Sequence, residues 1–305
     1  MSETLGEYVI IDPAFRGLVS RNMRLVQLWT GAAWTEGPVY FADGNYLLFS
    51  DIPNDRIMRF VPDASGLQGS TGVFRQPAHN ANGHTRDVEG RLVSCEHGAR
   101  RVTRTELDGR ITVLAERYQA KRLNSPNDVV VKSDGTVWFS DPPYGILSDL
   151  EGWKGEQEYG GAFVFCLDPR TGDLRVVADD FDRPNGLCFS PDEKTLYIAD
   201  TGAGLGHMRA FGVTADNRLT GGRVFAKCDA GRYDGFRADT SGRIWSSAND
   251  GIHCLAPSGE LLGKILVPEI VSNVCFGGPK RNRLFITGTT SLYAVYTHVN
   301  GAQRP

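Results

Sequence analysis

Six polar residues of this 305-residue chain each stand at the front of a similar pair of short apolar runs. They are Glu36, Asn82, Asn127, Asn185, Asp234 and Asn273, in openings such as TEGPVYF, PNDVVV, PNGLCF and YDGFRAD. Carboxylate and amide oxygens are hard donors, the kind that Ca²⁺ gathers in large sets together with waters. If the six positions are structurally equivalent, they converge on one point and could hold a divalent cation there.

The spacing of these leading residues indicates a repeated structural unit. The steps between them run from 39 residues (234 to 273) to 58 residues (127 to 185), around the length of a four-stranded propeller blade. Each apolar pair is followed by material for two more strands, as in DRIMRFVPD, and long amphipathic helical stretches are nearly absent. We therefore predict an all-β fold, a six-bladed β-propeller that forms a single domain over residues 1–305.

Three further features of the sequence fit this propeller. The last repeat, SLYAVYT, is one strand short, so we expect the segment MRLVQLWTG, from Met23 to Gly31, to close the last blade. The insertion PPYGILSDLEGWKGEQEYGG, within the longest repeat, is interpreted as a surface loop. Trp34, Trp138 and Trp245 occupy similar places in the repeats and are expected in the core between blades.

The first strand of each propeller blade lines the central channel, so the leading residues should meet at one mouth of it. The second strand is antiparallel and returns to that mouth, which places Asp51, Glu96, Asp141, Asp200 and Asn249 around the same opening. The alternative is that Asn, Asp and Gly here are only turn residues that satisfy local backbone groups. That alternative explains Glu36 poorly and does not account for the ring.

We predict that the metal ligands are Glu36, Asn127, Asn185 and Asp234. This oxygen-only set suits Ca²⁺, and Mn²⁺ or Mg²⁺ under tighter geometric constraint. Zn²⁺ is a further alternative, although a structural zinc site without sulfur or nitrogen would be unusual. Without the metal the two carboxylates would repel each other, and one would have to stay protonated.

Composition restricts the partners and the compartment. The net charge is −3 and no basic stripe is present, which argues against nucleic acid as a partner. No uninterrupted apolar stretch is long enough to cross a bilayer, and the N-terminus has no secretory signal. The six cysteines are scattered without a C-x-x-C pair. These features predict a reduced, cytoplasmic protein that makes no membrane contact.

The stretches WTEGPVYF, NSPNDVVV, RPNGLCFS and RYDGFRAD resemble the gluconolactonase, regucalcin and luciferin-regenerating-enzyme family of six-bladed propellers. The resemblance implies that Glu36, Asn185 and Asp234 bind a divalent cation, that Asn127 faces the ion or the substrate, and that Asp234 transfers the proton. The stretch NGHTRDVEGRLVSCEHGARRV is similar to the bacterial gluconolactonase branch. One departure is Ser125, where the regucalcin branch has an arginine that helps to hold the sugar lactone.

The predicted function is a metal-dependent hydrolase that opens a sugar lactone such as gluconolactone. Asp234 would act as general base on a water, and Asn127, with Asp141, Tyr144 or His97 at the rim, would orient sugar hydroxyls. A propeller phosphotriesterase is one alternative, and a non-catalytic calcium-binding propeller that serves as an interaction scaffold is another. The motifs G-x-S-x-G, the P-loop and H-E-x-x-H do not occur in the sequence.

Overall fold

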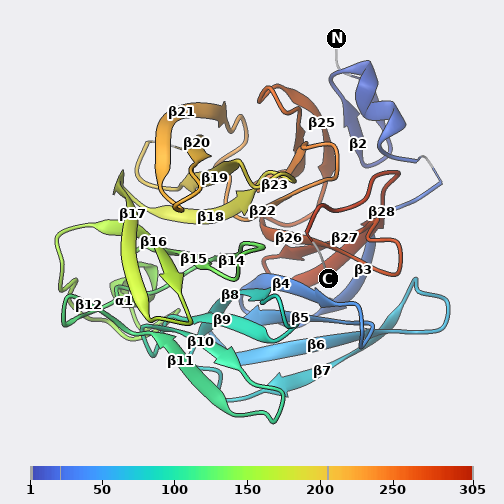
Figure 1. Cartoon of the computed structure of the whole chain (residues 1–305). Coiled ribbons are helices and arrows are strands. Elements are labelled where there is room, and N and C mark those ends of the chain that lie inside the picture. Colours follow the sequence, from blue (N-terminus) through green and yellow to red (C-terminus); the bar gives the residue numbers. More distant parts are fainter. Residues whose placement is uncertain (1–2, 21, 205, 304–305) are drawn as a thin grey trace.

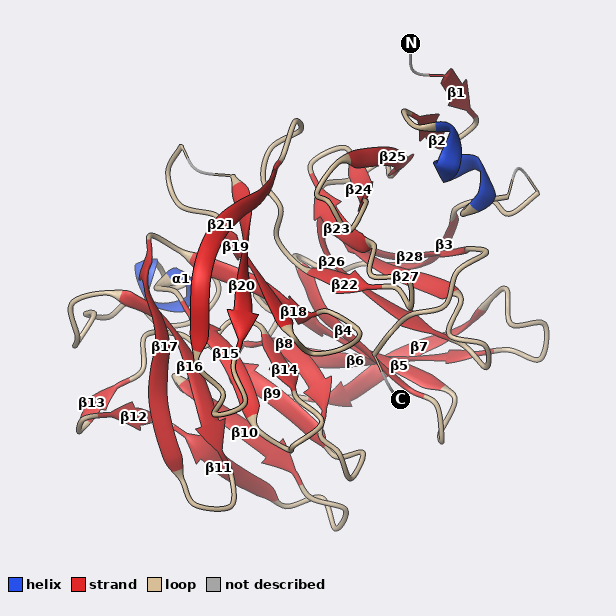
Figure 2. Cartoon of the chain, turned by 45° about the horizontal axis from the view of Figure 1, so that its top comes forward, coloured by secondary structure: helices blue, strands red, loops and turns tan. Residues whose placement is uncertain are grey.

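The computed structural model describes residues 3–20, 22–204 and 206–303, which form a ring of six antiparallel sheets (Figure 1) and one separate two-stranded sheet. Each sheet of the ring is one blade, and its innermost strand contacts the innermost strands of the blades on either side. The predicted all-β, six-bladed propeller is confirmed. Figure 2 shows the two short helices, η1 (Pro13–Gly17) beside the N-terminal strands and α1 (Tyr144–Leu147) on the other side of the ring, near blade 3.

The blades follow one another along the chain, and the strands of each run from the channel outwards. Blade 1 consists of β4 (Thr35–Phe41), β5 (Tyr46–Asp51), β6 (Arg56–Pro62) and β7 (Gly69–Arg75). Blade 2 consists of β8 (Ala81–Arg86), β9 (Leu92–Glu96), β10 (Arg101–Thr105) and β11 (Ile111–Ala115). Blade 3 consists of β14 (Val129–Val131), β15 (Val137–Asp141), β16 (Ala162–Asp168) and β17 (Asp173–Phe181). A two-stranded ribbon of β12 (Arg117–Tyr118) and β13 (Lys121–Arg122) precedes blade 3.

The second half of the chain forms the other three blades. Blade 4 consists of β18 (Pro184–Phe189), β19 (Thr195–Asp200), β20 (His207–Val213) and β21 (Leu219–Lys227). Blade 5 consists of β22 (Phe236–Ala238), β23 (Ile244–Ala248), β24 (Gly251–Leu255) and β25 (Leu261–Leu266). Blade 6 contains β26 (Val271–Gly277), β27 (Arg283–Gly288) and β28 (Ser291–Tyr296). Two N-terminal strands, β1 (Glu3–Leu5) and β2 (Tyr8–Ile10), add to the outer edge of blade 5 beyond β25.

Blade 6 takes its outer strand from the N-terminal part of the chain. Strand β3 (Val26–Thr30) pairs antiparallel with β28, with Trp29 opposite Leu292 and Thr30 opposite Ser291. It lies inside the segment Met23–Gly31 from which the sequence analysis expected the closing strand. This pairing joins the N-terminal and C-terminal parts of the chain by hydrogen bonds within one blade, and it gives β28 a partner on both sides.

Apolar side chains fill the interfaces between neighbouring blades. Trp138 of blade 3 packs edge-on against Phe189 of blade 4, with ring centroids 5.4 Å apart. Trp245 of blade 5 packs in the same way against Phe276 of blade 6 at 6.1 Å. Both tryptophans are fully buried, as expected. The expectation for Trp34 was wrong, because this residue is half-buried and lines a cavity at the channel mouth.

The C-terminal segment crosses the end of the channel opposite the leading residues. Gly301 forms a bridge with Asp239, and Ala302 donates from its backbone to Ala238 at the far end of β22. The side-chain amide of Gln303 donates to Thr85 Oγ1 of blade 2 at 3.0 Å. The segment therefore ties blade 5 to blade 2 across this end of the ring.

All six cysteines are free thiols in the structure. Among the described residues, no helix has the length and apolar character needed to span a membrane.

The fold also buries an imidazole that should make stability depend on pH. His84 Nε2 and Nδ1 lie 2.8 Å from the hydroxyls of Ser50 and Ser94, and burial lowers the pKa of His84 to about 3. As the pH falls, His84 therefore takes up a proton in the unfolded chain at a higher pH than in the folded chain. Its contribution to the free energy of unfolding is fully present above the unfolded pKa near 6.5 and is lost as the pH falls towards 3. We expect the difference in free energy of unfolding between wild type and His84→Gln to shrink below pH 6.5 by about 1.4 kcal/mol per pH unit. Urea titrations of both proteins at a series of pH values measure this, and a difference independent of pH would contradict it.

Candidate active site at the channel mouth

Four of the six leading residues lie at irregular points within the inner strands, whereas Asn127 and Asp234 lie just before β14 and β22. The register shifts between Glu36 and Val39 in β4, between Pro184 and Leu187 in β18, and likewise at the starts of β8 and β26. A β-bulge of this kind changes the direction of a side chain. The Glu-Gly dipeptide of β4 and the Asn-Gly dipeptide of β18 therefore form part of the channel wall and are not hairpin turns.

The glycine after each of these two residues lets the neighbouring inner strand approach. A Cβ on Gly37, whose φ is +54°, would lie 2.0 Å from the carbonyl oxygen of Asn82. A Cβ on Gly186 would lie 2.0 Å from the carbonyl oxygen of Asp234. Only glycine allows these backbone contacts, and they bring the leading residues of adjacent blades close together.

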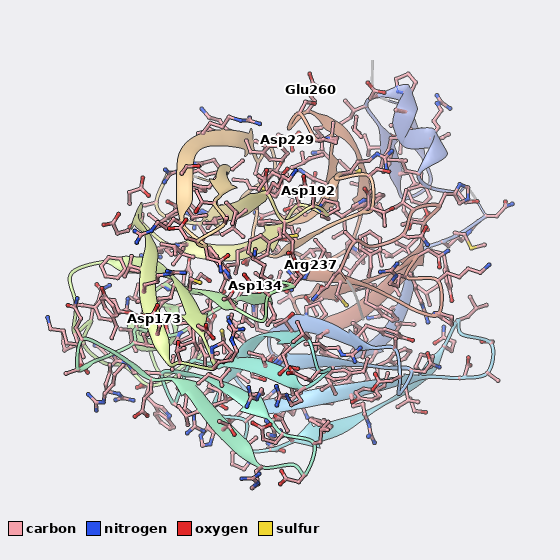
Figure 3. The ribbon with its side chains drawn as sticks, viewed as in Figure 1. Asp134, Asp173, Asp192, Asp229, Arg237 and Glu260 are labelled. Carbon is pink, nitrogen blue, oxygen red and sulfur yellow. The ribbon has the colours of Figure 1, made fainter. Side chains whose placement is uncertain are left out.

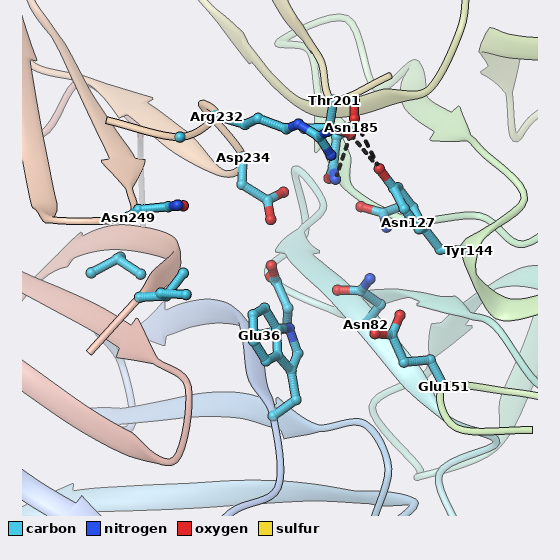
Figure 4. Close-up of a pocket in the computed structure, with 14 residues that line it drawn as sticks. Glu36, Asn82, Asn127, Tyr144, Glu151, Asn185, Thr201, Arg232, Asp234 and Asn249 are labelled. Carbon is cyan, nitrogen blue, oxygen red and sulfur yellow. Dashed lines mark hydrogen bonds between the residues drawn. The ribbon is translucent and has the colours of Figure 1, made fainter. Parts of the chain in front are cut away.

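A cavity of about 520 Å³ opens at this mouth of the channel (Figure 4). Its lining includes all four predicted metal ligands, Glu36, Asn127, Asn185 and Asp234, together with Tyr144. The structure thus brings together side chains from blades 1, 3, 4 and 5. Their oxygens are the donors that the sequence analysis assigned to a divalent cation.

Glu36 is fixed by two hydrogen bonds to the same oxygen. Its Oε2 accepts from the backbone N–H of Gly37 at 2.6 Å and from Asn273 Nδ2 at 3.0 Å. Asn273, the sixth leading residue, thus orients Glu36 instead of lining the cavity. Figure 4 shows the Glu36 carboxyl group directed towards that of Asp234. The second oxygen, Oε1, receives no hydrogen bond from a described residue and is free to bind a cation.

Burial and mutual repulsion perturb both carboxyl groups. Burial raises the pKa of Glu36 to about 8, and the charges of Asp128 and Glu151 add to this shift. The pKa of Asp234 is raised well above its usual range by burial, and then by the charge of Glu36. Two facing carboxyl groups with raised pKa values are a place where a divalent cation replaces protons.

Of the two amide residues predicted to bind the cation, Asn185 is held so that its side-chain oxygen is available. Asn185 Nδ2 donates to Thr201 Oγ1 at 3.3 Å, which leaves its Oδ1 unused by this contact. The same hydroxyl of Thr201 lies 2.7 Å from the hydroxyl of Tyr144. Asn127 is buried, and its backbone N–H donates to Ser140 O at 2.9 Å. Two carboxylates and two amide oxygens therefore fit the predicted cation.

Asp141 does not contact the cavity, so its predicted role in substrate binding is wrong. The side chain is fully buried, and its Oδ2 accepts from the backbone N–H of Asn124 at 2.8 Å and from the hydroxyl of Tyr159. Equivalent aspartates make equivalent contacts, since Asp51 accepts from the backbone of Ala33 and Asp200 from that of Arg183, each at 3.0 Å. These strand-end carboxylates hold the segment that enters the inner strand of the same blade.

The prediction that His97 contacts the substrate is also wrong, because its side chain is fully buried behind the cavity wall. Ser125, at the position of the family arginine, is buried as well, and its hydroxyl oxygen accepts from the backbone N–H of Gly145 at 2.9 Å. Arg122 does not line the cavity; its guanidinium donates to Ala99 O at 3.4 Å. Neither residue supplies the positive charge that the missing arginine would provide.

The sequence analysis missed several residues of the cavity wall. Besides Trp34, they are Glu151, Thr201 and Arg232. Asn82, expected at the mouth as a leading residue, lines the cavity, although the sequence analysis gave it no role there. Glu151 comes from the part of the insertion that follows α1. The sequence analysis interpreted the insertion only as a surface loop, and the position of Glu151 follows no repeat. Asn249, expected at the mouth, does line the cavity.

A second group with metal-binding atoms lies on blade 5. Asp229, Asp250 and His253 approach one another there, and Figure 3 labels Asp229 on this side of the molecule. The ammonium group of Lys264 lies 2.7 Å from Asp229 and 2.9 Å from Asp250. The lysine offsets part of the charge of these carboxylates, and His253 Nε2 lies 2.7 Å from Asp250, so the group is accounted for as an ion-pair cluster.

The chain is a six-bladed propeller with carboxylate and amide oxygens at one mouth of its channel. The comparisons with known proteins identify the family of such propellers to which it belongs. The chain belongs to the family described as the SMP-30/Gluconolactonase/LRE-like region, whose model matches residues 34–290. It is 31% identical to the gluconolactonase of Zymomonas mobilis, over 98% of this chain and 88% of that protein. It is 29% identical to the pentonolactonase XacC of Haloferax volcanii, over 83% of this chain and 80% of that protein.

Solved structures agree with this result. A gluconolactonase from Xanthomonas campestris is 37% identical and superposes with a TM-score of 0.88, over 94% of this chain and 93% of that chain. Regucalcin from Agrobacterium tumefaciens, at 20% identity and a TM-score of 0.74, shares the fold over 92% of this chain and 96% of that chain. The predicted family is confirmed. The predicted enzyme class agrees with the gluconolactonases and the pentonolactonase among these relatives.

Proposed function

We propose that this protein is a metal-dependent hydrolase that opens a sugar lactone. The observation that carries the proposal is the pair of facing carboxyl groups, Glu36 and Asp234, which meet the amide side chains of Asn127 and Asn185 in one cavity. The gluconolactonases and the pentonolactonase to which the chain is similar support a sugar lactone as the substrate class.

Glu36, Asn127, Asn185 and Asp234 would hold the cation, and the donor set favours Ca²⁺. When bound, such an ion polarises a lactone carbonyl and stabilises the negative charge that develops on its oxygen. Glu36 is suited to be a ligand only, since its Oε2 is already engaged by Gly37 and Asn273. Asp234 differs because no described residue donates a hydrogen bond to its carboxyl group, so one oxygen remains for proton transfer.

The chain's own residues then account for the proton transfers. Asp234 takes a proton from the water that attacks the carbonyl carbon, and the bond from that carbon to the ring oxygen breaks. The ring oxygen leaves as an alcohol after it receives the proton, and the product is a hydroxy acid. The backbone N–H of Asp234 donates to the hydroxyl oxygen of Ser247 at 3.0 Å. This contact fixes the base relative to the strands of blade 5.

An activity assay with and without chelator tests the proposal. Hydrolysis of D-glucono-1,5-lactone should stop when the metal is removed and return when Ca²⁺ is added. Activity confined to organophosphate triesters would favour a propeller phosphotriesterase instead. Ion binding without any hydrolysis would favour a non-catalytic calcium-binding scaffold. A cytoplasmic location remains a prediction from the sequence.

A further inference from the structure

A buried histidine connects two separate parts of the cavity wall. His97 lies in the turn between β9 and β10, and its side chain is fully buried. Its Nε2 lies 3.1 Å from Nδ2 of Asn82, the leading residue of blade 2. Its Nδ1 lies 3.2 Å from the backbone carbonyl oxygen of Glu151 in the loop after α1. Asn82 and Glu151 both line the cavity.

The chemistry of these two contacts fixes the direction of the Asn82 amide. A carbonyl oxygen can only accept, so Nδ1 of His97 carries the hydrogen. Burial lowers the pKa of His97 to about 4, so the ring is neutral at pH 7 and its Nε2 must accept a hydrogen bond. Asn82 therefore offers its Nδ2 to the ring. Its Oδ1 is buried and receives no hydrogen bond from a described residue, and Figure 4 shows this side chain at the cavity.

The surroundings of His97 make this arrangement rigid. A Cβ on Gly145 of α1 would lie 2.5 Å from the Cβ of His97, so the helix packs against the histidine without free space. Arg100, from the same turn, donates to the carbonyl oxygens of Leu123 at 2.6 Å and Glu156 at 3.1 Å. The β9–β10 turn thus anchors the loop that carries Glu151 at two points.

We propose that His97 is a positioning residue that fixes Asn82 and Glu151 as a pair of hydrogen-bond acceptors for the hydroxyl groups of the sugar lactone. This inference rests on the proposed function and assigns one side of the cavity to the sugar. The Asn82 Oδ1 and the Glu151 carboxylate are acceptors that need donors, and hydroxyl groups supply donors. A buried acceptor without a partner costs free energy, which a bound sugar would recover.

Comparison of two lactones isolates this role. D-Glucono-1,5-lactone carries ring hydroxyls, whereas δ-valerolactone has the same ring and carbonyl without them. At saturating metal, Asn82→Leu and His97→Leu should raise KM for gluconolactone on the order of 5- to 10-fold, as expected for one neutral hydrogen bond, and Glu151→Ala on the order of 10- to 100-fold. The kinetic constants for δ-valerolactone should not change. Calorimetry with 1,5-anhydro-D-glucitol, which has hydroxyls but no carbonyl, should show the same losses of affinity.

Two matched variants complete the design. His97→Gln keeps an acceptor near the place of Nε2, so it should recover most of the affinity lost in His97→Leu. Glu156→Ala removes an exposed carboxylate of the same loop that does not line the cavity, and it should behave as wild type. Glu151→Ala lies on a surface loop, so the proposal stays testable even if a buried variant fails to fold.

The outcomes separate the two proposals. Equal losses on both lactones, or unchanged binding of 1,5-anhydro-D-glucitol, would overturn the role of His97 and Asn82. A loss of Ca²⁺ affinity in Asn82→Leu as large as in a ligand variant would instead make Asn82 a metal ligand and overturn its role as a hydroxyl acceptor. If the wild-type protein binds the sugar analogue but hydrolyses neither lactone, the proposed lactonase function fails while the hydroxyl-binding pair stands.

Discussion

We expect Asp234→Asn to lower lactone turnover by a factor of about 10² to 10⁴, the range typical for loss of a general base. The asparagine keeps an oxygen that can bind the metal but cannot take a proton from water. Metal affinity should therefore fall much less than turnover. Steady-state kinetics at saturating Ca²⁺, with metal affinity measured by calorimetry on the same preparation, give both numbers.

The pH profile of the wild-type enzyme provides a second readout for Asp234. Its pKa is raised in the metal-free protein by burial and by Glu36, and a bound divalent cation favours the ionised carboxylate and lowers that pKa again. The base is active when ionised, so activity in excess Ca²⁺ should fall as the pH decreases.

Asp229→Asn is a matched control, because it makes the same substitution on the same side of the protein in a residue that pairs with Lys264 and does not line the cavity. Its turnover should equal that of wild type. Near-normal turnover of Asp234→Asn would show that Asp234 is only a ligand. His97 could not then take the proton, since it lies behind the wall, and Glu151 would be the next carboxylate to test.

The repeat made the fold and the ring of polar residues predictable. Each blade follows the same order of strands, so residues at equivalent places must lie at equivalent heights along the channel. For that reason Glu36, Asn127, Asn185 and Asp234 could be grouped although up to 198 residues separate them (36 to 234).

The same reasoning failed where side-chain direction decides the outcome. The repeat places Asp141 at the correct end of its strand, but the carboxyl group turns to the backbone of Asn124 instead of the cavity. His97, one residue beyond a strand end, is covered by α1, which belongs to the insertion. Glu151 comes from that insertion, and a segment that occurs in one blade only leaves no periodic signal from which its contact with the cavity could be predicted.

The last prediction concerns Glu36, whose effect on stability should change sign with the metal. The pKa of about 8 in the metal-free protein means that the folded state prefers the protonated carboxyl group. The ordinary pKa of a glutamate is near 4.3, so this residue lowers the free energy of unfolding progressively as the pH rises from that value towards 8. In chelator at pH 8, Glu36→Gln should therefore be at least as stable as wild type.

Calcium should reverse that order. A ligand that binds only the folded protein stabilises it in proportion to the logarithm of its concentration over Kd, so wild type should show a Tm that rises with Ca²⁺. Glu36→Gln loses a charged ligand, and we expect its affinity to fall on the order of 100-fold or more, because the attraction between a carboxylate and a divalent cation is strong in a buried site. Thermal melts of both proteins in chelator and across a calcium series measure whether the order of their Tm values reverses.

Glu151→Gln separates a ligand from a nearby charge. Glu151 adds to the negative charge around Glu36, yet it lies at the rim of the cavity and is partly exposed. Its variant should keep most of the calcium-dependent rise in Tm. If Glu36→Gln kept the same rise, Glu36 would not be a ligand, and the raised pKa would reflect only the burial of an acid beside the channel. If both variants lost it equally, general negative charge would hold the ion, and the four-residue ligand set would be wrong.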